Sequence, residues 1–422
     1  MENVIDILKA RGLFEDTTSP DAGQWLNEPR TIYAGFDPTS DSLQAGNFVT
    51  IMALVHFQRC GHRVVAVAGG ATGMIGDPSG KSEERQLLSP DQVRRNLDGI
   101  RENLSRFLDF DHPTAPASIV DNNEWFEHFT FVDFLRDVGK HFRMGSMLGK
   151  DSVRTRLNSE AGMSFTEFSY QLLQAYDFLR LYDERACTVQ IGGSDQWGNI
   201  TAGIDLIRKL RGAETFGVTV PLVCDSSGQK FGKSAGNAIF LDAGKTTYYD
   251  FYQFFLRTTD EDAIRFLKIF TLLPLDEIET LEQELREHPE RRAAQRRLAE
   301  DVTRRVHGEK GLAVAQQASS VLFGESMAGL RADELLQIFA DVESTELPRA
   351  AVEDAAVVDV AAASGLCQSK GAARRLIQSG GCYLNNERVS GIEQTVTAGQ
   401  IIDGRLLVLR SGKKNYHLVK VS

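Results

Sequence analysis

The sequence predicts an α/β fold that begins with a parallel sheet, continues in helices and ends in a small α+β module. An apolar run at 31–36 is followed by a helical pattern and by a second apolar run at 64–68, which together make a strand–helix–strand unit. Two further apolar runs, at 188–191 and 218–223, end in turns rich in glycine and serine. From Thr247 the pattern is helical almost to the C-terminus, where short strands return. We therefore expect a Rossmann-like parallel-sheet domain, followed by a helical domain and a small α+β domain.

The composition is that of an ordinary globular chain. Of the 422 residues, 42% are hydrophobic and 25% are charged. The apolar runs fall short of the roughly 18 residues of a membrane span, and the charged, amphipathic N-terminus does not resemble a signal peptide. The five cysteines are scattered and form no CxxC pair, which argues against a zinc or disulfide framework and favours the reducing cytoplasm.

Charge is distributed unevenly along the chain. The net charge is −11, which by itself disfavours a nucleic acid partner. Between residues 361 and 422, however, nine lysines and arginines face three acids, so this stretch carries +6 and the rest of the chain −17. Such a basic module is typical of a polyanion site, although a solvated basic surface explains the charge equally well. Lys370, Arg374 and Arg375 fall together at the start of a predicted helix and suit phosphate contacts.

The stretch from Tyr33 to Asn47, YAGFDPTSDSLQAGN, contains the first candidate ligand site. The strand ends at Asp37-Pro38, and Asp41 or Ser42 is expected to cap the helix that follows. Gly46 lies in the first turns of that helix, where unsatisfied backbone amides and the positive end of the helix dipole suit a phosphate. Many α/β proteins turn this way without a ligand, so the stretch alone is a weak indication.

A glycine-rich loop follows the second strand. Its sequence, GGATGMIGDPSGKSEER, holds five glycines, so its backbone can lie against a ligand. Asp77 offers a carboxylate within this loop, and Lys81 and Arg85 offer positive charge beyond it. A flexible surface loop is the alternative interpretation. Amphipathic helices are expected after the loop, at 87–107 and at 124–148.

The segment FTEFSYQLLQAYDFLRLY predicts a helix with three polar groups in one row. Tyr170, Gln174 and Asp177 are spaced i, i+4 and i+7, so they share a helix face. A phenol, an amide and a carboxylate in such a row could bind an ammonium group and a hydroxyl. A polar stripe on the outer surface is the alternative.

Two more candidate sites follow later strands. The strand at 188–191 ends in GGSDQWGN, where Gly193 allows a close approach and Asp195 can accept hydrogen bonds from ribose hydroxyls, with Gln196 beside it. After the strand at 218–223, the sequence KFGKS places Lys230 and Lys233 on a glycine- and serine-containing loop that can swing over a triphosphate.

As a set, these motifs resemble those of the bacterial tyrosyl-tRNA synthetases of class I, from near residue 1 to the C-terminus. The motifs, in this order and spacing, are YAGFDPTSDSL, GGATGMIGDPSG, FSYQLLQAYDF, QIGGSDQWGNITAG and KFGKS. The resemblance implies activation of tyrosine with ATP to the adenylate, then transfer to tRNA(Tyr), in a cytoplasmic homodimer. Magnesium would accompany the ATP, with no resident metal and no tightly bound cofactor. Together with the change to helices at Thr247 and the mixed, polar segment from Met327 to Arg349, the resemblance gives four predicted parts. They are a catalytic domain at 1–245, a helical anticodon-side domain at 246–326, a linker at 327–352 and a ribosomal-protein-like RNA-binding domain at 353–422.

The resemblance assigns roles residue by residue. Tyr33 and Asp177 match the pair that reads the substrate phenol hydroxyl. The groups around the substrate ammonium and carboxylate are matched by Asp77, Tyr170, Gln174 and Gln196. The ATP site is matched by Asp37, Gln44, Gly46, Asn47, Gly193, Asp195 and Lys233. The groups that act on the reacting phosphates are matched by Thr39, Asn47, Lys81, Arg85, Lys230 and Lys233. The tyrosine carboxylate is already a nucleophile, so no side chain need act as a base, and catalysis rests on orientation and charge stabilisation.

One motif departs from the family pattern. The family usually has His-x-Gly-His at the helix start, whereas this chain has Gln44-Ala45-Gly46-Asn47. Both amides keep an N–H donor but cannot become charged. We hypothesise that Asn47 still serves ATP and that Gln44 can reach a phosphate. The altered motif leaves open a non-catalytic, synthetase-like RNA-binding protein, and a second alternative is an enzyme that joins tyrosine, or a tryptophan-like substrate, to something other than tRNA.

Overall fold

The computed structural model describes residues 2–79, 88–158, 162–234, 237–339, 342–413 and 415–422. The chain divides into two compact units. The first is made of Met1–Thr247 and Phe254–Gly308, and the second of Tyr248–Gln253 and Glu309–Ser422. Within the described residues, no helix combines the length and the apolar character that a membrane crossing requires.

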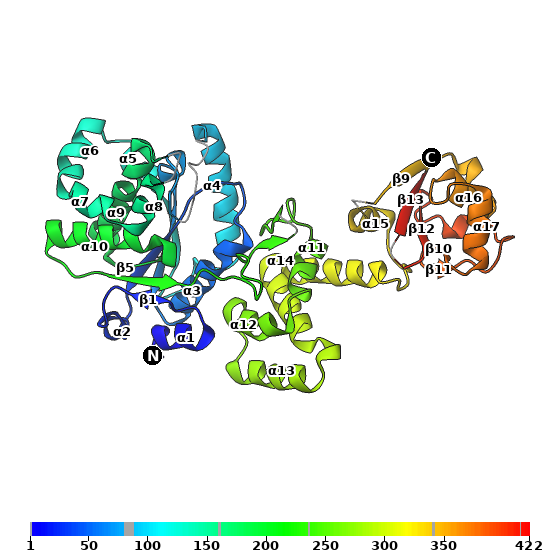
Figure 1. Cartoon of the computed structure of the whole chain (residues 1–422), viewed down its shortest axis with the longest axis horizontal. Helices are drawn as coiled ribbons and strands as arrows, with labels where there is room; N and C mark the ends of the chain where they lie inside the picture. Colours follow the sequence, from blue (N-terminus) through cyan, green and yellow to red (C-terminus); the bar gives the residue numbers. More distant parts are fainter. Residues whose placement is uncertain (1, 80–87, 159–161, 235–236, 340–341, 414) are drawn as a thin grey trace. The chain divides into compact units, whose positions relative to one another are not determined.

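A six-stranded sheet forms the centre of the first unit (Figure 1). Its strands are β1 (Asp16–Thr17), β2 (Thr31–Phe36), β3 (Arg63–Ala68), β4 (Ser118–Asp121), β5 (Cys187–Gly193) and β6 (Phe216–Val220). Their order is β1-β6-β5-β2-β3-β4, with β2 to β6 parallel and only the edge strand β1 antiparallel to its neighbour. The predicted parallel sheet is confirmed. The edge strands β1 and β4 were not predicted, because two and four residues give too short a pattern to recognise.

The order of the strands creates a switch point between β2 and β5. From β2 the chain proceeds outward to β3 and β4, whereas β5 starts on the other side of β2 and leads to β6. The loops that leave the carboxyl ends of β2 and β5 therefore run in opposite directions and leave a crevice between them.

Helices cover both faces of this sheet. On one face, α9 (Phe165–Arg185) and α10 (Trp197–Arg211) form an apolar core with Tyr33 and Val65. On the other face, α4 (Pro90–Ser105) packs Val93 and Leu97 against Ala68. The two sets of strand residues alternate because successive side chains of a strand point to opposite faces. Tyr33 thus faces α9, the helix that carries the row of polar groups.

The helix after β2 starts later than expected. A 3₁₀ turn at Ala45–Asn47 precedes α3 (Phe48–Arg59), and Gln44 stands in the cap position of that turn. The capping prediction for Asp41 and Ser42 was wrong because both side chains have distant partners. Asp41 pairs with Lys245 at 2.6 Å, and the buried Ser42 donates to the side chain of Asn103 at 3.1 Å.

The two predicted amphipathic helices differ in outcome. The helix expected at 87–107 is α4, whose N-cap is Ser89. The single helix expected at 124–148 is wrong, because α5 (Asn123–Phe126), α6 (Phe131–Asp137) and α7 (Met144–Leu148) replace it. Thr130 accepts from the backbone N–H of Asp133 and starts a new helix there, which interrupts the expected one.

Shorter elements complete the first unit. They are α1 (Val4–Arg11), α2 (Ala22–Trp25), α8 (Asp151–Leu157), the ribbon of β7 (Lys233–Ser234) and β8 (Asn237–Ala238), α12 (Asp260–Phe270) and α13 (Leu275–Glu287). Two helices contribute to both units, α11 (Tyr248–Leu256) and α14 (Ala293–Leu322). The helical pattern predicted after Thr247 is thus present. At Gly308, with φ 71° and ψ −179°, α14 leaves helical geometry, a conformation that glycine tolerates best.

The second unit contains a five-stranded sheet with the order β11-β10-β12-β13-β9. Its strands are β9 (Ser344–Leu347), β10 (Cys382–Leu384), β11 (Glu387–Arg388), β12 (Leu406–Ser411) and β13 (Asn415–Val421). Its helices are α15 (Ala332–Ile338), α16 (Val357–Ala363) and α17 (Lys370–Gln378). The small α+β module predicted at the C-terminus is confirmed.

The segment expected to be a linker, 327–352, belongs to this module. It contains α15, which packs Ala332 and Leu335 in one apolar cluster with Val408, and β9, which pairs in parallel with β13. The sequence conceals β9 because it is an edge strand whose residues are all exposed or half-buried, so it lacks an apolar run.

Candidate active site

A cavity of about 320 Å³ lies at the carboxyl ends of β2 and β5, within the first unit. It collects most of the residues that the sequence analysis selected. Those that line it are Tyr33, Asp37, Thr39, Gly46, Asn47, Asp77, Tyr170, Gln174, Asp177, Gly193, Asp195, Gln196 and Lys230. They come from the end of β2, the loop after β3, one face of α9, the end of β5 and the KFGKS loop. The polar row of α9 therefore faces the cavity and not the outer surface, which excludes the alternative of a solvated stripe.

One end of the cavity holds Tyr33 and Asp177. Tyr33 is 1% exposed, its ring packs 5.2 Å from that of Phe178, and its hydroxyl has no hydrogen-bond partner among the residues that the structure describes. Burial, and secondarily the nearby Asp177 carboxylate, raise the pKa of Tyr33 well above its ordinary value, so the phenol keeps its proton. A buried, unpaired hydroxyl in a ligand cavity is an unmet hydrogen-bonding group that a ligand can satisfy.

Asp177 is held on both carboxylate oxygens. Trp125 donates its indole N–H to one oxygen at 2.9 Å, and Asn122 donates to the other at 3.2 Å. Asp177 is 3% exposed, and this burial raises its pKa to about 7 although the two hydrogen bonds oppose the shift. The group is therefore an oriented acceptor whose charge changes near neutral pH.

The middle of the cavity contains two carboxylates, Asp37 and Asp77, the phenol of Tyr170 and the amides of Gln174 and Gln196. Tyr170 donates its hydroxyl proton to Asp37 at 2.8 Å, so its oxygen lone pairs remain available as acceptors. Gln196 donates to Asp77 at 2.6 Å. Burial first, and then the charge of Asp37, raise the pKa of Tyr170, which keeps this phenol neutral. Neutral and negative acceptors gathered in this way suit a cation with several N–H donors.

Close packing at two glycines brings the carboxylates into place. A side chain at Gly69 would lie 2.2 Å from the carboxylate of Asp37, and one at Gly193 would lie 2.6 Å from that of Asp195. From the sequence, we expect Gly193 to let a ligand approach, and Gly193 does line the cavity. The absence of a side chain at Gly193 also makes room for the carboxylate of Asp195.

The far end of the cavity lies at the start of the α3 region. Thr39, Gly46 and Asn47 line it, whereas Gln44 does not. Asn47 accepts from the backbone N–H of Gln44 at 3.0 Å through its side-chain oxygen. With the oxygen so engaged, the NH₂ group of Asn47 is the part of the amide left to meet a ligand.

The KFGKS loop contributes Lys230 to the cavity. Next to it, Phe231 stacks on Phe270 with ring centroids 4.5 Å apart. The turn that leads into the loop is closed by Asp225, whose carboxylate accepts from the backbone N–H of Gln229 at 3.0 Å. An aromatic anchor and a closed turn therefore flank the lysine.

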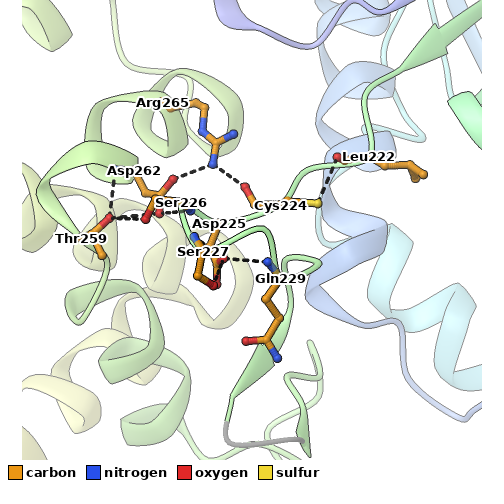
Figure 2. A network of polar contacts seen from close by, with 9 residues as sticks. All are labelled: Leu222, Cys224, Asp225, Ser226, Ser227, Gln229, Thr259, Asp262 and Arg265. Carbon is orange, nitrogen blue, oxygen red and sulfur yellow. Dashed lines mark hydrogen bonds and ion pairs between the residues drawn. The ribbon is translucent and has the colours of Figure 1, made fainter.

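That turn is also tied to the start of α12 (Figure 2). Asp262 accepts from the backbone N–H of Ser226 at 2.8 Å and from the hydroxyl of Thr259 at 3.0 Å. Arg265 donates to the other oxygen of Asp262 at 2.6 Å. Burial alone would raise the pKa of Asp262, but these hydrogen bonds hold it below its ordinary value. The turn that precedes Lys230 is thus held in place by the ionised, buried carboxylate of Asp262.

Some of the predicted site residues do not line the cavity, and others are not among the residues that the structure describes. Lys81 and Arg85 lie outside the described residues. Lys233 begins β7, and the description does not extend to its side chain. The residues predicted to contact RNA, Lys370, Arg374 and Arg375, are exposed on α17 in the second unit, where Lys370 pairs with Asp359 at 2.9 Å.

Several polar residues of the site were not selected from the sequence. Asn122 and Trp125 follow β4, a strand too short to be recognised, so nothing drew attention to them. Thr72 donates to Asp37 at 2.8 Å from the glycine-rich loop. Asn199 was visible in the motif QIGGSDQWGNITAG but received no role, because its contacts depend on three separate segments.

Comparison with known proteins matches nearly the whole chain. The family described as tRNA synthetases class I (W and Y) matches residues 26–324, and the Tyrosine--tRNA ligase SYY-like C-terminal domain matches residues 334–419. The tyrosine–tRNA ligase of Protochlamydia amoebophila is 49% identical over 422 residues, which is 100% of this chain and 99% of that protein. That of Geobacillus kaustophilus is 50% identical over 416 residues, which is 98% of each.

The fold also resembles solved structures. A C-terminally truncated mitochondrial tyrosyl-tRNA synthetase of Aspergillus nidulans superposes with a TM-score of 0.68 at 31% identity. The match covers 76% of this chain and 95% of that one. The similarity in structure thus extends over most of the chain, and the similarity in sequence over nearly all of it.

Proposed function

Because the chain belongs to the tyrosine–tRNA ligases of the class I tRNA synthetases, we propose that the cavity at the ends of β2 and β5 is where tyrosine is activated. The enzyme uses ATP to join tyrosine to its tRNA. The similarity to ligases over the full length leaves the alternative of a non-catalytic RNA-binding protein without support.

The observation that carries this assignment is the unpaired hydroxyl of Tyr33 in the same cavity as Asp177. A phenol hydroxyl of the substrate can donate its proton to the Asp177 carboxylate and accept from Tyr33. Phenylalanine would leave both groups without a partner in a buried site, which is unfavourable. Tyr33 and Asp177 therefore select tyrosine by its hydroxyl.

The substrate ammonium group is assigned to the middle of the cavity. Asp77, Tyr170 and Gln174 supply a carboxylate, a phenol oxygen and an amide oxygen there. All three are acceptors for N–H donors, and the carboxylate adds charge neutralisation. Gln196 lies beside them and is assigned to the reacting carboxylate.

The nucleotide is assigned to the far end. There the tyrosine carboxylate attacks the α-phosphorus of ATP, the new bond forms the adenylate, and the bond to pyrophosphate breaks. Asp195 would accept from the ribose hydroxyls, while the backbone N–H of Asp37, Thr39, Gly46 and Asn47 would face the phosphates. Lys230, with Lys233, Lys81 and Arg85, would stabilise the negative charge of the leaving pyrophosphate. Gln44 is proposed as a further phosphate donor.

Magnesium is proposed to enter with the ATP, bound to its phosphates. Among the described residues there is no group of three or more His, Cys, Asp or Glu side chains that could hold a metal ion. The chain's own contribution would then be to bind and orient the nucleotide through the residues named above.

The second step requires tRNA. The 3′ ribose hydroxyl of the tRNA attacks the acyl carbon of the adenylate, and AMP leaves. Lys370, Arg374 and Arg375, exposed on α17 in the basic C-terminal module, are proposed to bind the phosphates of that tRNA. The catalytic, helical and RNA-binding domains given by the sequence remain part of this proposal, with the RNA-binding domain extended to include α15 and β9.

A homodimer is proposed from the apolar side chains left exposed on α6, α7 and α9. Phe131, Val132, Met144 and Phe165 are 59–68% exposed, although they are large and apolar. Such exposure is typical of an interface, and a second copy of the chain is the proposed partner. The cytoplasm is the proposed compartment, because all five cysteines are free thiols and that compartment is reducing.

Two assays test the proposed function together. Purified protein should catalyse ATP–pyrophosphate exchange that depends on tyrosine, and should charge tRNA(Tyr). The variants Tyr33→Phe and Asp177→Asn should lower the exchange rate with tyrosine more than with phenylalanine. Equal effects on both amino acids would contradict the assignment of the phenol site, while undiminished charging after replacement of Lys370, Arg374 and Arg375 by alanine would contradict the role of α17.

A further inference from the structure

Asn199 lies at the third position of α10, beside the proposed ammonium site, and is 6% exposed. Its side-chain nitrogen lies 3.2 Å from the amide oxygen of Gln174 and 3.2 Å from that of Gln196. The same nitrogen lies 3.4 Å from a carboxylate oxygen of Asp77 and 3.4 Å from the hydroxyl of Ser79. Asn199 does not itself line the cavity, whereas Asp77, Gln174 and Gln196 do.

These contacts set the orientation of two amides. A glutamine side chain can turn over and exchange its oxygen for its NH₂ group, and the choice depends on its neighbours. The donor on Asn199 favours the orientation in which Gln174 and Gln196 turn their oxygens toward it. For Gln196 this orientation agrees with its second contact, because its NH₂ group donates to Asp77 at 2.6 Å.

The orientation of Gln174 matters for the substrate. An oxygen that accepts from Asn199 keeps a second lone pair for an ammonium group, whereas the reversed amide would present N–H groups to the N–H groups of the substrate. Asp77 is fixed by the same system, since Gln196 contacts one of its oxygens and Asn199 lies near the other.

We propose that Asn199 is a positioning residue for the ammonium site, which keeps Gln174 and Asp77 in the orientation that accepts the substrate's N–H groups and fixes the amide of Gln196 beside them. This rests on the proposed function, because it takes from it the place of the ammonium group. Asn199 acts through its neighbours and has no role in the chemical step.

The start of α10 has other supports, so the role of Asn199 can be separated from a role in folding. Lys150 donates to the carbonyl of Gly198, and Thr201 donates to the carbonyl of Trp197 at 2.9 Å. Loss of the Asn199 amide therefore leaves the first turn of the helix tied to Lys150 and closed by its own Thr201. Thr201→Val offers a matched control, since Thr201 contacts the backbone of its own helix.

The experiment compares two ligands that differ in the ammonium group. Binding of L-tyrosine and of 3-(4-hydroxyphenyl)propanoate is measured by calorimetry, directly for the first and by displacement for the second. Asn199→Leu keeps the approximate shape but removes the donor, and it should weaken L-tyrosine about tenfold or more. The propanoate should bind the variant within twofold of the unmodified protein. Asn199→Ser, which retains one O–H donor, should fall between the two.

The ratio of the two affinities is unaffected by partial unfolding, because both ligands bind only the folded fraction. An equal loss for both ligands, or no loss for either, would overturn the proposal. The variant Asp77→Asn distinguishes an error in the role of Asn199 from an error in the location of the ammonium site. If it weakens L-tyrosine selectively and Asn199→Leu does not, only the role of Asn199 is wrong. If neither variant discriminates between the ligands, the ammonium site is elsewhere and the role of Asn199 fails with it.

Discussion

The indole N–H of Trp125 donates to the carboxylate of Asp177 at 2.9 Å, and both side chains are buried. Asn122 holds the other oxygen at 3.2 Å. The carboxylate proposed to accept the substrate phenol is therefore oriented before tyrosine arrives. Such preorganisation lowers the cost of binding, because less freedom is lost when the ligand enters.

Tyrosine binding should depend on Asp177 between pH 6 and 8. Burial raises the pKa of Asp177 to about 7, and the ionised carboxylate is the stronger acceptor for a phenol hydroxyl. At pH 6 only about one tenth of the protein carries the ionised form, so affinity should rise about tenfold from pH 6 to pH 8. Calorimetric titrations with L-tyrosine measure this, and Asp177→Asn should flatten the profile. The same slope in both proteins would contradict the prediction.

The same group should affect stability in the opposite direction. Its pKa is higher in the folded protein than in the unfolded chain, so the folded state holds the proton more tightly between about pH 4 and pH 7. Its contribution is thus fully present below pH 4 and is lost as the pH rises to about 7, on the order of 4 kcal/mol in total. Unfolding by urea should show Asp177→Asn gaining stability relative to the unmodified protein across this range. A constant difference would be inconsistent with a buried, titrating Asp177.

Removal of the Tyr33 hydroxyl should reduce specificity without reducing stability. The hydroxyl is buried and has no partner in the described part of the chain, so Tyr33→Phe removes no hydrogen bond there from the free protein. With tyrosine bound, one neutral hydrogen bond is lost, about 0.5–1.5 kcal/mol, or three- to tenfold. The ratio of kcat/KM for tyrosine over phenylalanine in pyrophosphate exchange should fall by that factor. A lower melting temperature for Tyr33→Phe would show that the hydroxyl has a structural partner.

The sequence predicted the inward-facing parts of the site better than their supports. Tyr170, Gln174 and Asp177 could be found because helical periodicity is a local property, and the structure has them on one face of α9. Asn122 and Trp125 could not be found, because their importance comes from contact with Asp177 more than fifty residues away. The periodicity of one segment indicates which of its side chains share a face. It does not indicate which other segments will pack against that face.

The fold shows the same division. The buried strands β2 and β3 were predicted within one residue, because both consist of continuous apolar runs. The cap at Asp41 or Ser42 was wrong because tertiary contacts to Lys245 and Asn103 outweighed the local preference. The expected linker at 327–352 proved structured for a related reason, since its edge strand is defined by pairing with β13.

Histidines placed in the altered motif should introduce an ionisation that this chain lacks. Gln44 and Asn47 cannot change charge, whereas histidine titrates near pH 6.5. In pyrophosphate exchange at saturating tyrosine, where Asp177 is already engaged, the rate of the unmodified enzyme should show no ionisation from this motif between pH 6 and 8. Gln44→His and Asn47→His should each add a pH-dependent step. Profiles unchanged by both substitutions would mean that neither position meets the phosphates.

Loss of the Asp262 carboxylate should slow the chemical step while sparing tyrosine binding. Asp262→Ala removes the acceptor for the Ser226 N–H and the carboxylate that Arg265 contacts at 2.6 Å, which leaves Arg265 bonded to the carbonyl of Cys224 (Figure 2). The turn before Lys230 should then become less ordered, with a loss of stability of about 1–3 kcal/mol. We expect a lower kcat in pyrophosphate exchange at an unchanged KM for tyrosine. Glu261→Ala is the control, because it removes an exposed acid from the same helical turn, and an equal effect of both variants would indicate a helix-dipole effect alone.

Removal of the C-terminal module should impair tRNA charging while preserving tyrosine activation, provided that the module is removed together with α15 and β9. A cut after Val352, where the sequence placed the end of the linker, would leave α15 and β9 without the strands they pack against. A variant ending at Ser320 removes that whole apolar cluster, and it should keep tyrosine-dependent exchange near the full-length rate. Charging of tRNA(Tyr) should fall at least tenfold, because the basic residues of α17 are lost.

The variant ending at Val352 should be less soluble, since it exposes Leu335 and Phe339. Equal loss of exchange and charging in the shorter variant would show that the module supports the catalytic unit itself.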